Sequence, residues 1–228
     1  MLVRFLLALG LAVACGADCR AALGGEGLPS EFSTEALGQR LRLNGVPLEV
    51  LALATPLSPH RACSLIAERW GKVSGAALMG CRQSGEWLLV SACIGTQELT
   101  VQLREQSLGS RGYFSKIDLR ARPGTTPLPH VPMPVGAQVR SVLQSSGPEG
   151  ETVQFIVGMP LSPKMALLRM TEHARRFGWE VSSPPQPWAS GGTFDMRRRN
   201  EAARGVLTRD ARGSGLVLIE TTPGARWP

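Results

Sequence analysis

Apolar and polar residues follow the same plan in two separate stretches of the chain. An apolar run of strand length, Val46–Leu53, leads into Pro56-Leu57-Ser58-Pro59 and then into apolar residues at helical spacing. The same order recurs where Thr152–Val157 leads into Pro160-Leu161-Ser162-Pro163 and a second helical stretch. Because internal repeats fix the architecture of a chain, we interpret the two stretches as copies of one structural unit.

Both copies of the tetrapeptide carry signals for the start of a helix. Ser58 and Ser162 suit the N-cap position, where a hydroxyl accepts a hydrogen bond from an amide of the first turn. Pro59 and Pro163 suit the first helical position, where the missing N–H costs nothing. Gly178 then suits the end of the second helix, because glycine enters the left-handed conformation freely. The tetrapeptide is therefore expected to form a strand-to-helix turn rather than a binding loop.

After each helical stretch the pattern changes to that of strands. The predicted strands are Trp87–Cys93, Leu99–Leu103 and Tyr113–Leu119 in the first copy, and Trp179–Val181, Thr193–Met196, Gly205–Thr208 and Leu216–Ile219 in the second. The sequence thus predicts an α+β fold of two tandem β-α-β-β-β repeats. In each repeat, one helix is expected to cover a mostly antiparallel sheet.

Composition divides the chain into four segments. Residues 1–21 form a leader that is expected to be cleaved, and residues 22–120 form the first repeat with a lead-in. That lead-in contains one short run at helical spacing, Thr34–Leu41. Residues 121–136 contain five prolines and are expected to form a semi-rigid linker. Residues 137–228 form the second repeat.

The leader resembles a secretory signal peptide. Arg4 precedes the apolar run Phe5–Ala14, which is too short to span a bilayer. Ala12-Val13-Ala14 matches an ordinary signal-peptidase site. The same residues with Cys15 also resemble a lipobox, although alanine stands where leucine is usual. The mature protein is therefore expected in the periplasm, or lipidated at Cys15 and anchored to a membrane facing the periplasm.

Four cysteines remain once Cys15 is set aside, namely Cys19, Cys63, Cys81 and Cys93. An even number permits two disulfides, and four cysteines allow three pairings. The last three lie in the first repeat, so we expect a disulfide local to that repeat, as an oxidising compartment permits. No C-x-x-C pair is present, which argues against a metal site.

The chain carries a formal net charge of +7, and most of its cations are arginines. The densest basic run is Arg197-Arg198-Arg199, close to Arg204. Such a run either protects a sheet edge against aggregation or binds an acidic protein or an anionic membrane surface. Nucleic acid is not expected as a partner, because no nucleic-acid-binding motif is recognisable. Trp188 follows the proline-rich segment 184–187, which is either loop cover or a recognition element. The partner-binding candidates are Arg197, Arg198, Arg199, Arg204 and Trp188.

The motifs that usually mark enzymes are missing from the sequence. There is no G-x-S-x-G, no Walker loop and no H-E-x-x-H. The three histidines, His60, His130 and His173, come from a helix start, the linker and the second helix, and we do not expect them to converge. Glu68 and Glu172 occupy equivalent places on solvated helix faces. The sequence therefore predicts no catalytic residue, no cofactor and no metal.

Export, two compact repeats and missing chemistry together favour action through a surface. The expectation is a non-enzymatic protein of a bacterial-type envelope that binds another envelope protein, as an accessory subunit of a secretion or pilus-type assembly. One alternative is a periplasmic module that binds a small molecule or lipid. A further alternative is a hydrolase whose residues converge only in three dimensions.

Overall fold

The chain folds into two units in a computed structural model. The structure describes residues 27–37, 40–147, 150–181, 186–188 and 190–223, with 186–188 described by their backbone alone. Of the described residues, unit 1 comprises 27–37 and Val46–Arg122, and unit 2 comprises 40–45 and those from Pro123 onward. The predicted leader, with Cys15 and Cys19, lies outside the described residues.

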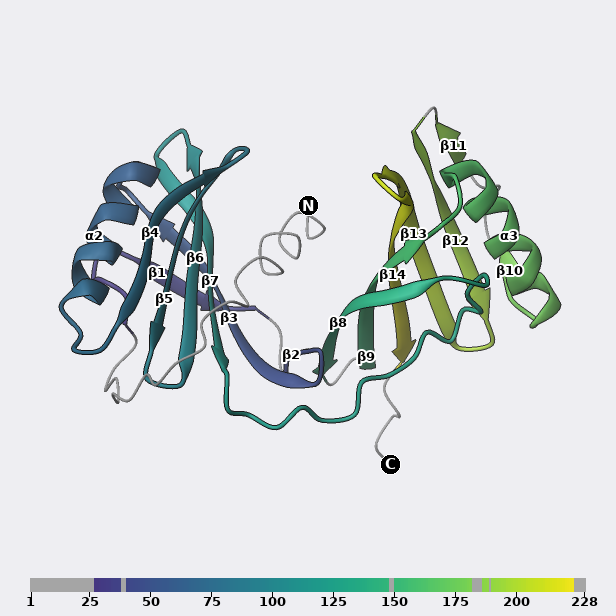
Figure 1. Cartoon of the computed structure of the whole chain (residues 1–228), viewed down its shortest axis with the longest axis horizontal. Helices are drawn as coiled ribbons and strands as arrows, with labels where there is room; N and C mark the ends of the chain where they lie inside the picture. The colour runs from purple at the N-terminus through teal and green to yellow at the C-terminus, as the bar shows by residue number, and fades with distance from the viewer. Residues whose placement is uncertain (1–26, 38–39, 148–149, 182–185, 189, 224–228) are drawn as a thin grey trace. The chain divides into compact units, whose positions relative to one another are not determined.

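Unit 1 is an antiparallel sheet with a helix on one face (Figure 1). The order across the sheet is β1-β3-β7-β6-β5-β4. The elements of this unit are β1 (Ser33–Ala36), β3 (Val46–Thr55), α2 (Pro59–Gly71), β4 (Ala77–Ser84), β5 (Trp87–Ile94), β6 (Gln97–Gln106) and β7 (Gly109–Asp118).

The helix α2 begins at Pro59, as the sequence predicts. Ser58 occupies the N-cap in an extended conformation, but its side chain makes no capping hydrogen bond. The apolar stripe of the helix is fully buried and packs on the inward face of the sheet, and it consists of Ala62, Cys63, Ile66 and Trp70. Burial of a side chain such as Ile66 stabilises the fold by about 1.5–3 kcal/mol.

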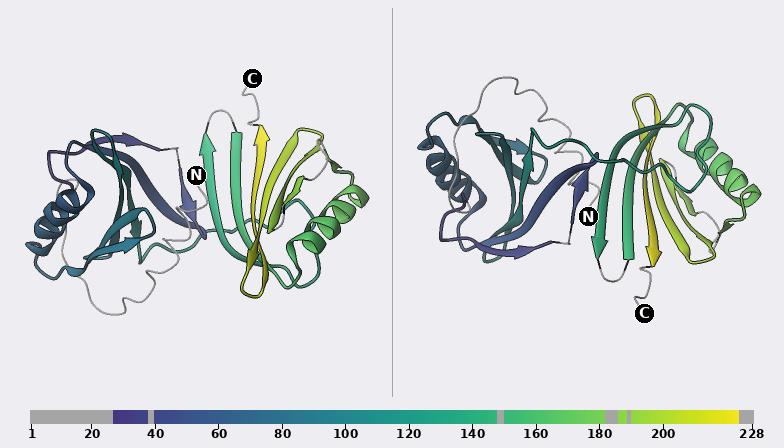
Figure 2. Two further views of the ribbon diagram at one scale, coloured as in Figure 1. Left: turned by 90° about the horizontal axis from the view of Figure 1, so that it is seen from above. Right: turned by 90° about the horizontal axis from the view of Figure 1, so that it is seen from below.

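Unit 2 has the same arrangement, and the views of Figure 2 show a helix on one face of the sheet in each unit. The order across the sheet is β10-β12-β13-β14-β9-β8-β2, with β11 also paired to β12. The elements of this unit are β2 (Arg42–Leu43), β8 (Gln138–Gly147), β9 (Gly150–Met159), α3 (Pro163–Arg176), β10 (Glu180–Val181), β11 (Gln186–Trp188), β12 (Gly191–Arg198), β13 (Glu201–Asp210) and β14 (Gly213–Pro223).

Both predicted ends of α3 are confirmed. The Ser162 hydroxyl accepts a hydrogen bond from the Met165 amide at 3.4 Å, and Pro163 opens the helix. Gly178 follows the C-cap residue Phe177 with φ +78°, a conformation that glycine adopts without a steric penalty. The buried stripe consists of Ala166, Leu167, Met170, Thr171 and Ala174.

The two units share one topology in a constant register. Along the chain, each passes from a strand through a helix to an antiparallel series whose last strand pairs with the first. Five elements of unit 2 begin 104 residues after their counterparts in unit 1. These pairs of first residues are Val46 and Gly150, Pro59 and Pro163, Trp87 and Gly191, Gln97 and Glu201, and Gly109 and Gly213.

A Gly-Ser pair in each unit also follows this register. A Cβ at Gly109 would meet the backbone of Thr55 and Pro56, and a Cβ at Gly213 would meet that of Met159 and Leu161. The turn between the last two strands is thus packed on the repeated tetrapeptide in both units.

The mostly antiparallel α+β architecture is confirmed, but the strand pattern β-α-β-β-β is too short. In unit 1, β4 follows the helix before the three strands that the sequence predicts. Seven of its eight residues are exposed and the other is half-buried, so no apolar alternation marks it. In addition, β1 and β8 each pair with the strand that leads to the helix.

The predicted helical run Thr34–Leu41 is wrong. Ser33–Ala36 instead forms β1, which pairs with β3, and the Leu37 amide donates to the Val50 carbonyl at 2.9 Å. All four side chains of β1 are exposed. Cross-strand backbone hydrogen bonds therefore decide its conformation, and the weak apolar spacing does not.

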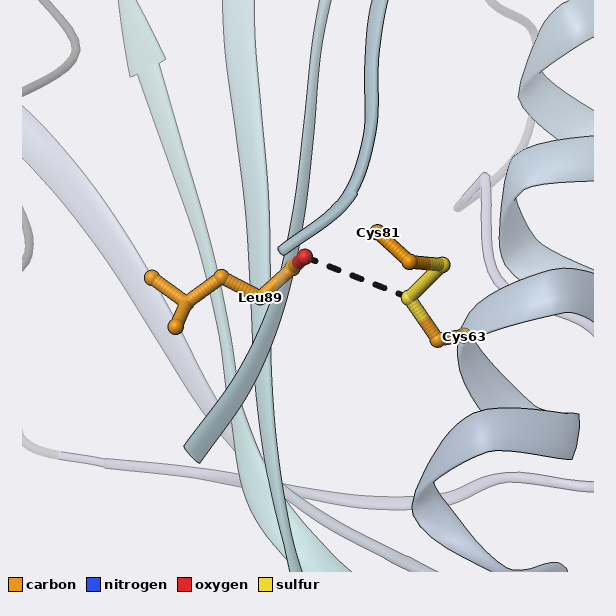
Figure 3. The surroundings of a disulfide bond; sticks show 3 residues. All are labelled: Cys63, Cys81 and Leu89. Carbon is orange, nitrogen blue, oxygen red and sulfur yellow. Dashed lines mark hydrogen bonds between the residues drawn. A yellow bond between two sulfur atoms is a disulfide. The ribbon is translucent and has the colours of Figure 1, made fainter. Parts of the chain in front are cut away.

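The expected disulfide local to the first repeat is confirmed (Figure 3). It joins Cys63 on α2 to Cys81 on β4, with a Cα–Cα distance of 6.1 Å and a sequence separation of 18. The Cys63 sulfur lies 3.9 Å from the Leu89 carbonyl oxygen of β5. Cys93 is buried in β5. The disulfide thereby ties the edge strand β4 to the helix that covers the sheet.

A short segment before β3 belongs to the sheet of unit 2. Arg42 and Leu43 form β2, which pairs with β8. Asn44 extends this pairing, because its amide donates to the Val142 carbonyl and its side-chain oxygen accepts from the Val142 amide, both at 2.8 Å. Unit 2 is therefore assembled from two stretches of chain that are separated by unit 1 in the sequence.

Candidate partner-binding surface on helix α3

Helix α3 presents apolar side chains to solvent on the face turned away from its sheet. Met165 is 40% exposed, Leu168 is 48% exposed and Phe177 at the helix end is 57% exposed. On α2, all of whose residues are described, every large apolar side chain is buried or half-buried. In the constant register, Arg61 and Ser64 of α2 stand where Met165 and Leu168 stand in α3. The exposed apolar residues are thus a property of the second helix and not of the first.

The same face of α3 is strongly basic. It carries Lys164, Arg169, Arg175 and Arg176 against the single acid Glu172. Among the described residues, none of these four cations forms an ion pair. The helix therefore combines exposed apolar groups with positive charge that the described protein does not neutralise. The name α3 surface is used below for the apolar residues and cations of this face, namely Met165, Leu168, Phe177, Lys164, Arg169, Arg175 and Arg176.

A hollow of about 370 Å³ lies along one side of the α3 surface. Its helix wall consists of Arg169, Glu172, His173 and Arg176, and the opposite wall consists of Pro134, Val135 and Leu161. The Val135 side chain is 97% exposed, and the His173 ring packs on Phe177 with a centroid distance of 5.3 Å. We call this the α3 hollow.

Two of the four predicted arginine candidates form ion pairs within unit 2. Arg204 pairs with Asp195 at 2.6 Å, which raises the pKa of the Arg204 guanidinium mainly through this hydrogen bond. Arg198 binds Glu201 through two nitrogens and lies over the Trp179 ring at 4.8 Å. Arg197 is exposed on β12, and Arg199 is exposed in the turn that follows. Trp188 lies in β11, but its side chain is outside the described residues.

His130 belongs to a network on unit 2. Its amide and that of Val131 donate to the Glu220 carboxylate at 3.0 and 2.9 Å, and its Nδ1 lies 3.1 Å from Glu201. Val131 is fully buried in the core of this unit. Burial of Glu220 raises the pKa of its carboxyl, and the two amide donors oppose that rise. The network fixes the end of the proline-rich segment on the sheet of unit 2.

A second hollow, of about 580 Å³, lies in unit 1 between the start of β1 and the turn joining β6 to β7. Its lining is mostly polar and exposed, and includes Glu31, Ser107 and Arg111. The alternative of a small-molecule or lipid binding module requires a closed apolar pocket, whereas this hollow is polar and open to solvent.

Two further structural findings bear on function. Within the described ranges, no group of three or more His, Cys, Asp or Glu side chains could hold a metal ion. None of the helices in the described part of the chain is long and apolar enough to cross a membrane.

Comparison with protein-family models, with curated proteins and with solved structures found no match.

Sequence reasoning missed the α3 surface because Met165 and Leu168 blend into a helix that is apolar on its buried side as well. A position-by-position comparison of the two repeats would have found it. That comparison sets Arg61 and Ser64 opposite two apolar residues, and so marks the place where the copies differ in surface chemistry.

Proposed function

We propose that this chain is a non-enzymatic exported protein whose second unit binds an acidic partner protein of the cell envelope through the α3 surface. The observation that carries the proposal is that Met165 and Leu168 are exposed on a helix face whose cations form no ion pair with the described residues. Protein interfaces combine apolar contact with complementary charge, and a basic helix face favours an acidic partner.

A protein partner fits this face better than a membrane surface does. A helix that lies in a membrane interface inserts its apolar face into the lipid. In α3 that face, which includes Ala166, Leu167 and Met170, is already buried in the core of unit 2. The exposed side chains that remain are about half-covered, which suits a shallow protein contact.

Export is the second part of the proposal. The Cys63–Cys81 disulfide supports an oxidising compartment, and the leader predicted for residues 1–21 supports a route to one. A partner would then lie in the same compartment, and an accessory role in a secretion or pilus-type assembly is one setting for such a pair.

We also propose that the chain arose by duplication of one module and that its two copies have diverged in use. The constant register of 104 residues supports this interpretation. Unit 1 keeps a polar helix face and carries the disulfide, whereas unit 2 carries the α3 surface. The first copy therefore supplies control residues for experiments on the second.

Site-specific photo-cross-linking in cells that make the protein tests the proposed surface. A photoreactive amino acid placed at Leu168 should give a discrete adduct with one acidic protein. The same group at Ser64, the counterpart on α2, should not. Met165→Arg with Leu168→Ser installs the α2 residues and should abolish the adduct formed from a second reporter placed at Phe177.

The double variant must remain folded for that result to count. Since both side chains are about half-covered, we expect each substitution to lower the free energy of unfolding by no more than about 1 kcal/mol, as urea titration would measure. Equal adducts from Leu168 and Ser64, or an adduct that survives the double substitution, would contradict the proposed function.

A further inference from the structure

The α3 hollow is lined by a row of basic side chains, and the acid Glu172 lies beside them. Arg169, His173 and Arg176 are four and three residues apart, so their side chains lie on one side of α3. At about 1.5 Å of rise per residue, the row is about 10 Å long. The facing residues Pro134, Val135 and Leu161 carry no charge.

The equivalent place on α2 differs in a specific way. There Glu68 and Lys72 form an ion pair at 2.7 Å, and this hydrogen bond, together with the Lys72 charge, lowers the pKa of the Glu68 carboxyl. The counterparts on α3 are Glu172 and Arg176, which are both described and are not joined by an ion pair. The first cation of the row, Arg169, corresponds to Leu65. The middle residue, His173, corresponds to Arg69, so the row has arginines at its two ends in unit 2 and an arginine at its middle in unit 1. Arg176 also lacks the ion pair to the helix acid that Lys72 makes in unit 1.

The shape of the hollow decides what kind of group would use these cations. A guanidinium presents parallel N–H donors that match a carboxylate, and two arginines about two turns apart can hold one carboxylate each or share one. The half-buried residues Pro134 and Leu161 on the opposite wall would shield one side of such a group from water and thereby strengthen its attraction to the arginines.

We propose that the α3 hollow receives carboxylate side chains from an acidic segment of the partner, held by Arg169 and Arg176 with His173 between them. This inference rests on the proposed function and deepens it by naming the chemistry of the partner. The apolar residues of the same segment would lie on Met165 and Leu168. The partner segment is thus one in which acidic and apolar residues alternate.

A defined peptide tests the inference on the full mature protein. The probe is an acetylated, amidated peptide of alternating Glu and Leu, about four residues long, because an extended chain rises about 3.3 Å per residue and so matches the row of about 10 Å. Its control replaces each Glu by Gln. Binding is measured by calorimetry and by the imidazole NMR signals of the three histidines. We expect the Glu peptide to shift the signals of His173 while those of His60 and His130 stay unchanged, and we expect the Gln peptide to do neither.

Variants on the same helix separate a built site from general attraction. Arg169→Leu installs the α2 residue, and Arg176→Gln removes the second cation. Each should weaken binding of the Glu peptide about tenfold, as expected for loss of a charge-assisted hydrogen-bonded pair. Arg175→Gln removes a charge from α3 outside the hollow and should weaken binding by less than about twofold, as for a charge exposed at the rim of a contact.

Three results would overturn the inference. One is an equal loss for Arg175→Gln and Arg169→Leu, which would mean diffuse electrostatics. Another is a larger effect on His173 from inorganic phosphate than from the Glu peptide, which would mean a phosphate site. The last is an unchanged photo-adduct at Leu168 in the Arg169→Leu, Arg176→Gln variant, which would refute the carboxylate site but leave the proposed function standing.

Discussion

Glu220 is a buried carboxylate that holds the proline-rich segment on the sheet of unit 2. Its carboxylate lies on β14, is 6% exposed, and accepts the amides of His130 and Val131. Burial raises its pKa above the ordinary value of 4.5. The native state therefore binds the proton of Glu220 more readily than the unfolded chain does.

This sign predicts a pH dependence. A raised pKa contributes stability that is fully present below the ordinary pKa of the carboxyl and is lost as the pH rises through the raised value. Glu220→Gln removes that contribution. Urea titrations from about pH 4 to about pH 7 should therefore show wild type losing stability relative to the variant as the pH rises.

Other charged groups near Glu220, namely Glu201 and His130, could also make stability depend on pH, so the measurement needs a control. A His130→Gln background removes the imidazole ring whose Nδ1 lies 3.1 Å from Glu201. In that background, the difference in free energy of unfolding between the proteins with and without Glu220→Gln should change with pH as it does in the presence of His130. Parallel pH profiles of wild type and Glu220→Gln would show that burial of this carboxyl has no such effect.

At the scale of elements, the disulfide compensates for an edge strand that buries almost nothing. Among the described strands, β4 pairs only with β5, and it exposes nearly all of its side chains. Its register also shifts between Leu78 and Cys81, which interrupts the ladder. The covalent link to α2 supplies the attachment that side-chain packing does not.

Removing this link should therefore destabilise unit 1. For a loop closed by cysteines 18 residues apart, chain-entropy arguments give a cost of about 3 kcal/mol. We expect Cys63→Ala with Cys81→Ala to lower the free energy of unfolding by about this amount in urea titration. A reducing agent should lower the stability of wild type toward that of the variant and leave the variant unchanged. Equal stability of the oxidised wild type and the variant would contradict this role.

At the scale of the whole molecule, the order of elements in the sequence differs from their membership of the two units. Residues 39–45 precede β3 of unit 1 but belong to unit 2, where β2 lies beside β8. Asn44 holds this connection through its two hydrogen bonds to Val142, and it does so at φ +52°. Asparagine tolerates that conformation better than most residues.

A substitution at Asn44 should accordingly weaken unit 2 and spare unit 1. Asn44→Gly keeps the positive φ accessible and removes only the side-chain acceptor, so a loss of about 1 kcal/mol is expected. Hydrogen exchange should locate the loss at the Val142 amide and along β8, with the amides of β5 and β6 unchanged. Faster exchange in β5 and β6, with β8 unaffected, would contradict the assignment of this segment to unit 2.

Much of each unit was predictable because its signals are local. Proline at the first helical position, glycine at a positive φ and an apolar stripe at helical spacing act within a few residues, and they placed both helices correctly. The strands β5, β6 and β9 turn apolar residues at alternate positions into the core and so show an apolar pattern. The strands β1 and β4 bury neither face, and the sequence carries no signal for them.

The sequence by itself determined the repeated plan, the α+β class and a disulfide within the first repeat. It did so because caps, periodicity and cysteine count depend on near neighbours. Only the tertiary structure decided that Cys63 pairs with Cys81, that β2 joins the second sheet and that Arg198 and Arg204 form ion pairs with Glu201 and Asp195. Those outcomes depend on cross-strand and long-range contacts, whose partners no local pattern names. The exposure of Met165 and Leu168 belongs with them, since an apolar side chain becomes a surface feature only once the fold has decided what covers it.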